Sequence, residues 1–382
     1  MKDRKKIEAF LDHLISVSTP SQPAWNKEAV LEGTAPKWNY IDGCMIKGIL
    51  EMYHATKEEK YIWFAESFID YYVKEDGTLL GYDLKELNCD NINQGKVLFD
   101  LLDYSKKEKY KKALDLLYSQ IMVQPRTKEG NFWHKKIYPY QIWLDGLYMV
   151  QPFYLEYEKR FNGYKNYLDV FKQFENVQKI MKNEETGLFY HGYDETKEMF
   201  WADKKTGLSK NFWTRSLGWY SMALVDTLEV MDEQFFMEYR SLQLNLKELL
   251  DSLINFQDKE TKMFYQVTTK GDRAGNYLET SGSCAIAYSL MKGAKCGHLP
   301  EEYFNYGKDI FESVLKYKLE EKNGILVLKD ICLIAGLGGM PGKGNYKDRD
   351  GSFEYYISEP IVDDDAKGVA PFLFAAAYSI AP

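Results

Sequence analysis

The sequence predicts an all-α protein folded as an (α/α)6 barrel, a closed ring of six helical hairpins. Six runs with helical spacing are apolar or small nearly all round, which is typical of buried helices. The stretches between them, such as 59–76 and 106–122, carry one apolar stripe and one Lys/Glu-rich face, as surface helices do. One inner and one outer helix per unit, six times over, predicts a toroid in which the starts of the inner helices line one end.

The predicted inner helices start 50 to 85 residues apart, at Trp38, Asp90, Tyr140, Asn211, Ser281 and Ala366. Most follow a short segment of glycine with aromatic or aliphatic residues, such as GLFYHGYD from Gly187, which we interpret as a connecting loop. An open helical solenoid of the same units is the alternative, and the unequal unit lengths favour the closed ring. No Pro/Ser-rich linker interrupts the series, so we expect a single catalytic domain over residues 1–382.

Composition and charge exclude several classes of protein. The 382 residues contain 49 Lys+Arg and 57 Asp+Glu, and a net charge of −8 argues against a nucleic-acid binder. The start has Glu8 and Asp12 where a signal peptide needs an apolar run, and no stretch is long enough to span a membrane. Five scattered cysteines without a C-x-x-C pair indicate neither a disulfide framework nor a zinc knuckle. We therefore expect a cytoplasmic protein without membrane attachment.

Motifs for metals and cofactors are also missing from the sequence. The five histidines form no H-x-x-x-H pair, and GLGGMPGKG around Gly338 lacks the spacing of a phosphate loop. The stretch DDDAKG at Asp363 lacks the alternating ligands of a calcium loop, and we interpret it as the cap of the last inner helix. We expect no metal and no cofactor.

Chemistry should lie where the loops meet the starts of the inner helices. The candidates there are Asn39, Tyr40, Asp90, His134, Lys135, Trp143, Asp145, His191, Trp213, Arg215 and Trp219. Their tryptophan faces, carboxylates and cations suit an anionic sugar, and Arg215 offers the planar fork that binds a carboxylate. Within FWTRSLGW, a buried guanidinium needs an anion to face.

Each candidate also has a purely structural interpretation. Asp145, flanked by apolar residues, either caps or pairs locally or is functional with a raised pKa. Asp90 could be an N-cap, and His191 a satisfied loop histidine. The tryptophans could belong to the core.

Five stretches carry a resemblance to a known family: FWHKKIYPYQIWLDGLYM, TGLFYHGYDETK, FWTRSLGWYSMALVD, FQDKETKMFYQVTTKGDR and LETSGSCAIAYSL. They resemble the unsaturated rhamnogalacturonyl hydrolases, glycoside hydrolase family 105, over nearly the whole chain from Trp38 onward. These enzymes act on fragments left by pectin lyases. The resemblance implies an (α/α)6 barrel with Asp145 as general acid/base. It also implies a sugar surrounded by Asp90, His191, Trp213, Arg215 and Trp219.

Further motifs of this family match with some departures. Trp38, Asn39 and Tyr40 match its aromatic-polar entry, although a more histidine-rich motif is expected there, and His134 and Lys135 match its FWHK loop. The loop between Gly336 and Ser352 looks longer than in the family, so the boundary of the pocket and the sugar beside the uronate stay open.

The implied reaction hydrates the C4=C5 double bond of a terminal unsaturated galacturonate and releases the partner sugar. One carboxyl group would protonate C4 and then accept a proton from the attacking water. For this role we expect burial among Trp143, Leu144 and Leu147, with the charge of Asp90 nearby, to raise the pKa of Asp145. Arg215 or Lys135 would position the substrate carboxylate.

Two other functions remain open. The first is another (α/α)6 sugar enzyme, either an unsaturated glucuronyl hydrolase, with Asp90 as a second catalytic carboxylate, or an epimerase. The second is a carbohydrate-binding toroid without catalysis. For the hydrolase the expected partner is a small unsaturated oligosaccharide, and we expect a monomer or a weak homo-oligomer.

Overall fold

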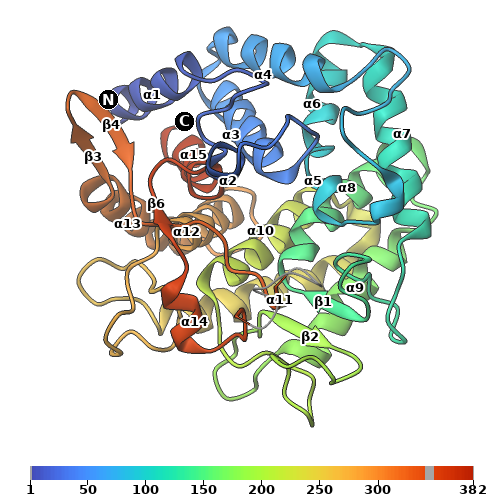
Figure 1. Cartoon of the computed structure of the whole chain (residues 1–382), viewed down its shortest axis with the longest axis vertical. Coiled ribbons are helices and arrows are strands. Elements are labelled where there is room, and N and C mark those ends of the chain that lie inside the picture. The colour runs from blue at the N-terminus through green and yellow to red at the C-terminus, as the bar shows by residue number, and fades with distance from the viewer. Residues whose placement is uncertain (1, 340–347, 382) are drawn as a thin grey trace.

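A computed structural model describes residues 2–339 and 348–381. In that part of the chain, the long helices alternate between an inner and an outer ring (Figure 1). The inner ring consists of α3 (Tyr40–Thr56), α5 (Asp90–Asn93) with α6 (Lys96–Ser105), α8 (Asp145–Phe161), α10 (Thr214–Val230), α12 (Thr280–Lys295) and α15 (Ala366–Ile380). The outer ring consists of α1 (Lys2–Ser16), α4 (Glu59–Tyr72), α7 (Glu108–Val123), α9 (Tyr167–Met181), α11 (Phe236–Ile254) and α13 (Glu302–Tyr317).

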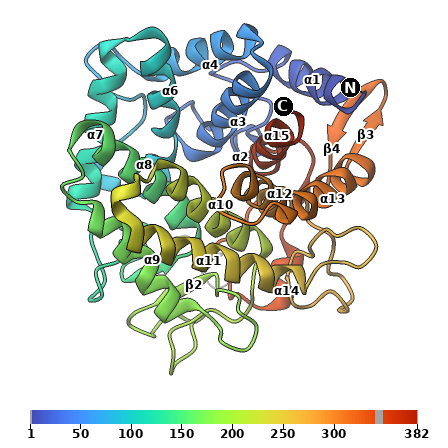
Figure 2. The same cartoon turned by 180° about the vertical axis from the view of Figure 1, so that it is seen from behind.

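The ring closes where α15 packs against α3, and both views show these two helices side by side (Figures 1 and 2). This contact confirms the predicted (α/α)6 barrel and excludes the open solenoid. The inner helices are buried almost all round: in α15 every residue from Ala366 to Ala377 is buried. The outer helices expose one polar face, as the Lys/Glu-rich stretches predicted.

Close approach between inner helices depends on glycine. A Cβ atom on Gly282 of α12 would lie 2.8 Å from the carbonyl carbon of Thr214 and 2.9 Å from the backbone nitrogen of Arg215. A Cβ atom on Gly43 of α3 would lie 2.6 Å from Cα of Gln94, where α5 passes. These glycines let the starts of neighbouring helices converge at one end of the ring.

Short elements decorate the ends of the ring. The remaining helical segments are α2 (Lys27–Glu32), α14 (Phe353–Ser358) and the 3-10 turns η1 (Leu84–Glu86) and η2 (Glu233–Phe235). Three two-stranded antiparallel sheets pair β1 (Gln141–Trp143) with β2 (Gly192–Asp194), β3 (Leu319–Lys322) with β4 (Ile325–Leu328), and β5 (Ile331–Cys332) with β6 (Ile361–Val362).

The start of the third inner helix differs from the prediction. The sequence predicted helix from Tyr140, but Gln141–Trp143 form a strand, with Trp143 opposite Gly192, and α8 begins only at Asp145. The fourth inner helix likewise begins at Thr214 rather than Asn211. The predicted cap of the last inner helix is confirmed, because the Asp365 side chain accepts a hydrogen bond from the backbone N–H of Lys367. No helix of the described residues is long and apolar enough to cross a membrane.

The glycine at the α10–α12 crossing gives a direct test of this packing. Replacing Gly282 with alanine forces the backbones of α10 and α12 apart, and we expect a loss of about 1–3 kcal/mol in the free energy of unfolding. Chemical denaturation measures it. The control is Gly48→Ala, where the added Cβ would meet mainly the Leu373 side chain at 3.2 Å and alanine also favours the helix. Equal stability of the two variants would contradict the close crossing.

Candidate functional site

A cavity of about 140 Å³ opens at the end of the ring where the inner helices begin. Its walls come from the first turns of α3, α5, α8, α10 and α15 and from the loops before them. Ten of the eleven candidates line it: Tyr40, Asp90, His134, Lys135, Trp143, Asp145, His191, Trp213, Arg215 and Trp219. Residues from five separate stretches of the sequence therefore meet in one place, as the closed ring predicted.

The β1–β2 sheet brings two of these stretches together. Its register places Trp143 opposite Gly192, the residue after His191. The Trp143 ring stacks on His134 at 4.8 Å between centroids and presents its edge to His191 at 5.9 Å. Its indole N–H donates to Gln141 at 3.0 Å, which fixes the ring between the two histidines. Trp143 thus lies between two clusters of polar side chains in the cavity, each of which contains one carboxylate.

Asp145 and His191 form the first of these groups. Asp145 is the first residue of α8, and its Oδ2 lies 3.3 Å from Nε2 of His191, with 14% of the side chain exposed. On the other side of the ring, Nδ1 of His191 lies 2.8 Å from the Tyr356 hydroxyl. Because the hydroxyl can hydrogen-bond Nδ1, Tyr356 orients the imidazole so that Nε2 faces Asp145.

The pKa of Asp145 is the one point where the predicted electrostatics of the site is wrong. Burial raises this pKa, as expected, but the charge of His191 and its ring nitrogen facing the carboxylate outweigh burial and lower it. The expectation considered only apolar neighbours and Asp90, and did not foresee a histidine in contact with the carboxyl. In the free protein, Asp145 is therefore a carboxylate at neutral pH.

Asp90 forms the second group with Lys135 and His134. The Lys135 ammonium lies 2.6 Å from Oδ2 of Asp90, and Nε2 of His134 lies 3.3 Å from Oδ1. Asp90 does not act as an N-cap, since its side chain points to these two partners. Burial lowers the pKa of His134 to about 4, so this ring is neutral at neutral pH. Because His134 is neutral, the negative charge of Asp90 is paired with Lys135 alone. The positive charge of Lys135 is therefore already compensated before any ligand binds.

Arg215 has no such carboxylate partner. Its guanidinium, 2% exposed, donates to the backbone oxygens of Cys332 and Leu333 and lies 4.7 Å from the centre of the Trp213 ring. Among the described residues no ion pair includes Arg215, so the anion that this guanidinium is expected to face is not one of their carboxylates. Nearby charges, including Glu279, raise its pKa despite burial. The cavity wall therefore holds a full positive charge that carbonyl oxygens, the Ser281 hydroxyl and an aromatic face solvate.

The candidates Trp213 and Trp219 line the cavity with one part of their rings and pack into the core with the rest. Trp213 donates its indole N–H to Gln266 and stacks on Tyr356 at 6.2 Å. Trp219 stacks on Tyr148 at 4.9 Å. Both tryptophans are almost fully buried, so they belong to the core as well as to the cavity.

Asn39 is the one candidate that does not line the cavity. Its side chain caps α3 by accepting from the backbone N–H of Asp42, and its amide donates to the Asp42 carboxylate at 2.7 Å. Capping is the common use of asparagine before a helix, and it explains this position fully.

Several cavity residues escaped the sequence analysis. Lys367 lies in the DDDAKG stretch that was interpreted only as a cap, and its ammonium contacts Glu28 at 2.6 Å and Asp365 at 3.0 Å. Glu28 comes from α2, outside the repeats. The backbone segment 334–336 closes another side, and residues 340–347 of the longer loop lie outside the described residues. No group of three or more metal-ligating side chains occurs in the described part of the chain.

Comparison with known proteins shows the family to which this fold and sequence are similar. Residues 17–380 match the family model described as Glycosyl Hydrolase Family 88. A solved structure of a C. acetobutylicum glycoside hydrolase from family 105 superposes with a TM-score of 0.86 at 44% identity, covering 93% of this chain and 97% of the other.

Two curated proteins are similar to this chain in sequence. Protein Atu3128 of Agrobacterium fabrum is 36% identical over 238 residues, which is 61% of this chain and 98% of that protein. The unsaturated rhamnogalacturonyl hydrolase YesR of Bacillus subtilis is 25% identical over 264 residues, which is 68% of this chain and 71% of YesR.

The Asp145–His191 contact predicts a measurable titration. Replacing His191 with phenylalanine removes the nitrogen that faces the carboxylate, so burial acts with less opposition and the pKa of Asp145 rises. Carbon-13 NMR of the aspartate carboxyl groups should show the Asp145 midpoint moving to higher pH. The matched control is His298→Phe, a buried histidine bonded to Tyr239 outside the cavity. An unmoved Asp145 midpoint in His191→Phe would refute this pairing.

Proposed function

The chain belongs to Glycosyl Hydrolase Family 88, and from this premise we propose that it hydrates the C4=C5 double bond of a terminal unsaturated galacturonate and so releases the partner sugar. The observation that carries the proposal is the meeting of Asp145, His191 and an Arg215 without a carboxylate partner in one cavity. This reaction needs a group that protonates C4, a second group that supplies that proton, and a cation that binds the substrate carboxylate.

The first step concerns the substrate carboxylate. The C4=C5 bond of a lyase product is conjugated with a carboxylate, so the substrate enters as an anion. Arg215 is the cation best able to receive it, because Lys135 already pairs with Asp90 at 2.6 Å. The remaining N–H donors of the guanidinium would hold the carboxylate in its plane.

The proton for C4 would pass through Asp145. Since His191 lowers the pKa of Asp145 in the free protein, the carboxyl must gain its proton after the substrate binds. The bound substrate excludes water and adds a negative charge, and both effects raise the pKa of a carboxyl. We assign His191 as the source of this proton through Nε2, with Tyr356 as the positioning residue on Nδ1.

The remaining steps use the carboxylate again. Asp145 gives its proton to C4, and positive charge develops at C5 and the ring oxygen. Water then adds its oxygen to C5 while the Asp145 carboxylate takes a proton from it. The resulting hemiketal opens to a ketone at C5, and the hemiacetal left at C1 releases the partner sugar. Transfer of the proton from Asp145 back to Nε2 of His191 restores the site, and the sum is the addition of one water molecule.

The substrate class rests on resemblance to YesR and on the motifs around Asp145. We propose a rhamnogalacturonan fragment from pectin degradation, processed in the cytoplasm by a single catalytic domain over residues 1–382. The alternative is an unsaturated glucuronyl hydrolase, which the position of Asp90 in the same cavity favours, since it could serve as a second catalytic carboxylate.

A panel of lyase products separates these functions. We expect the protein to remove the ultraviolet absorbance of the enol ether from unsaturated rhamnogalacturonan disaccharide and to leave unsaturated chondroitin disaccharide unchanged. The reverse preference would establish the glucuronyl alternative. Binding of the disaccharides without loss of absorbance would leave only a carbohydrate-binding toroid.

The role of Asp145 has its own test. Asp145→Asn keeps the size and polarity of the side chain but cannot exchange a proton, so kcat should fall by about 10²–10⁴-fold with substrate binding retained. The matched control is Asp194→Asn, a buried aspartate of β2 that bonds Thr196 and the backbone N–H of Met199 outside the cavity. Turnover near that of the unmodified protein would remove Asp145 from the mechanism.

A further inference from the structure

A second and larger cavity, of about 600 Å³, lies at the opposite end of the ring. Its walls come from the first half of α6 and from the middle and later turns of α3, α8, α10, α12 and α15, whereas the first turns of α3, α5, α8, α10 and α15 line the cavity of Asp145. It shares no lining residue with that cavity. The reaction proposed above makes no use of it.

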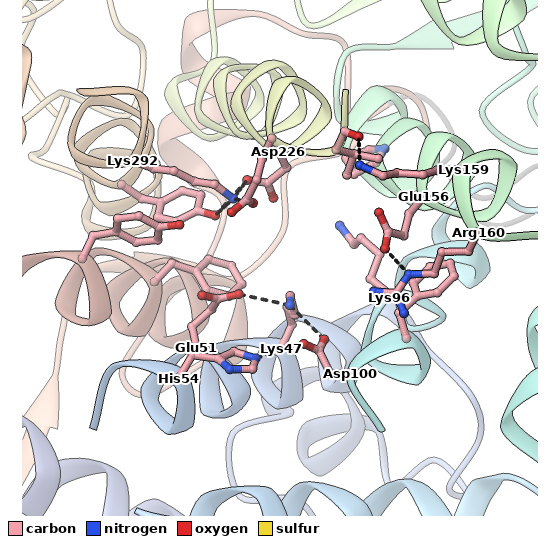
Figure 3. Close-up of a pocket in the computed structure, with 17 residues that line it drawn as sticks. Lys47, Glu51, His54, Lys96, Asp100, Glu156, Lys159, Arg160, Asp226 and Lys292 are labelled. Atoms are coloured by element: carbon pink, nitrogen blue, oxygen red, sulfur yellow. Dashed lines mark hydrogen bonds and ion pairs between the residues drawn. The ribbon is translucent and has the colours of Figure 1, made fainter. Parts of the chain in front are cut away.

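The wall of this cavity is made of ion pairs (Figure 3). Lys47 lies 3.0 Å from Glu51 and 2.9 Å from Asp100. Lys292 lies 2.8 Å from Asp226 and also pairs with Glu229. The C-terminal ends of the inner helices point here, and their partial negative charge favours such cations.

The pairing extends to the outer edge of the cavity. Arg160 pairs with Asp103 at 2.6 Å and with Glu156, and Lys159 pairs with Asp232 at 2.9 Å. Four of the five cations that line the cavity therefore have a carboxylate partner.

Lys96 is the exception. Its ammonium donates to the backbone oxygen of Tyr148 at 3.1 Å and lies 3.3 Å from the centre of the Tyr148 ring. Lys96 is 8% exposed, and no ion pair joins it to a carboxylate in the described part of the chain. An ammonium has three donors, so Lys96 keeps hydrogen-bonding capacity for a ligand in the cavity.

The charge on Lys96 is correspondingly costly. Burial lowers its pKa to about 7, and the charges of Lys47 on α3 and Lys292 on α12 act in the same direction. Asp226 on α10 acts in the opposite direction but already pairs with Lys292. Cys44 on α3 has a pKa raised to about 11, so its thiol is neutral at neutral pH. The neighbour from α8, Tyr148, offers a ring face and a carbonyl.

The rest of the wall selects the kind of ligand. The rings of Phe99, Tyr288, Phe374 and Tyr378 provide apolar faces, and the paired carboxylates can accept hydrogen bonds from hydroxyl groups. Because Lys96 is the one lining cation without a carboxylate partner among the described residues, the cavity suits a ligand with a single negative charge. A dianion such as phosphate would meet five carboxylates on the same wall.

We propose that this second cavity binds a small polyhydroxy monocarboxylate, such as a uronic acid, with its carboxylate on Lys96. Binding supplies the counter-charge that Lys96 lacks and holds this lysine in the protonated form. The proposal is independent of the reaction at Asp145, because the two cavities share no residue and its tests need no turnover.

Calorimetric titration with D-galacturonate tests the site, with D-galactose as the neutral probe. We expect galacturonate to bind and Lys96→Met to lose this binding event, with affinity weakened about tenfold or more, whereas Lys159→Met keeps it. Lys159→Met is the matched control because it removes a lysine from the same wall that already has Asp232. Equal effects of the two variants, or equal binding of galactose, would overturn the proposal.

A measurement on the unmodified protein covers the case in which Lys96→Met fails to fold. With carbon-13 at Cε of lysine, the Lys96 signal titrates with pH, and saturating galacturonate should move its midpoint to higher pH. Affinity should accordingly fall as the pH rises above about 7, because the free amine cannot bind the anion. A Lys96 midpoint that galacturonate leaves in place would refute the site.

Discussion

The common direction of the inner helices is the constraint on which both ends of this molecule depend. Each helix carries partial positive charge at its start and partial negative charge at its end. The two ends of a ring of parallel inner helices therefore differ in electrostatic potential. The first turns gather Asp90, Asp145 and Arg215 around one cavity. The other cavity gathers lysines and an arginine from the start of α6 and from the middle and last turns of α3, α8 and α12, and each of them but Lys96 pairs with a carboxylate among the described residues. This electrical difference between the two ends comes from the parallel helix backbones and does not depend on any particular side chain.

Much of the fold was predictable because it depends on local periodicity. Helices buried on all sides and helices with one polar face differ in composition, and their alternation along the chain is visible without a structure. The start of α8 was not predictable in this way. Gln141–Trp143 became a strand because Gly192–Asp194 pairs with it, and a partner about fifty residues away leaves no periodic signal in the stretch itself.

The candidate site shows the same division. Positions at the starts of the inner helices could be predicted from the repeat, and all but Asn39 line the cavity. The protonation state of Asp145 could not be predicted from the sequence. Its pKa depends on the 3.3 Å contact with His191 and not on the apolar residues beside it in the sequence. Tyr356 and Glu28 lie in stretches without a repeat signal, and only the folded ring brings them to their partners.

The packing of α15 against α3 has a consequence for how the protein is made. The ribosome synthesises α3 early and α15 more than three hundred residues later, so α3 has no such neighbour while the units between them are made. Until α15 emerges, the apolar side of α3 lacks its neighbour and is open to aggregation or chaperones. The same segment brings Lys367 to the cavity of Asp145, so the wall of that cavity is complete only after α15 has left the ribosome.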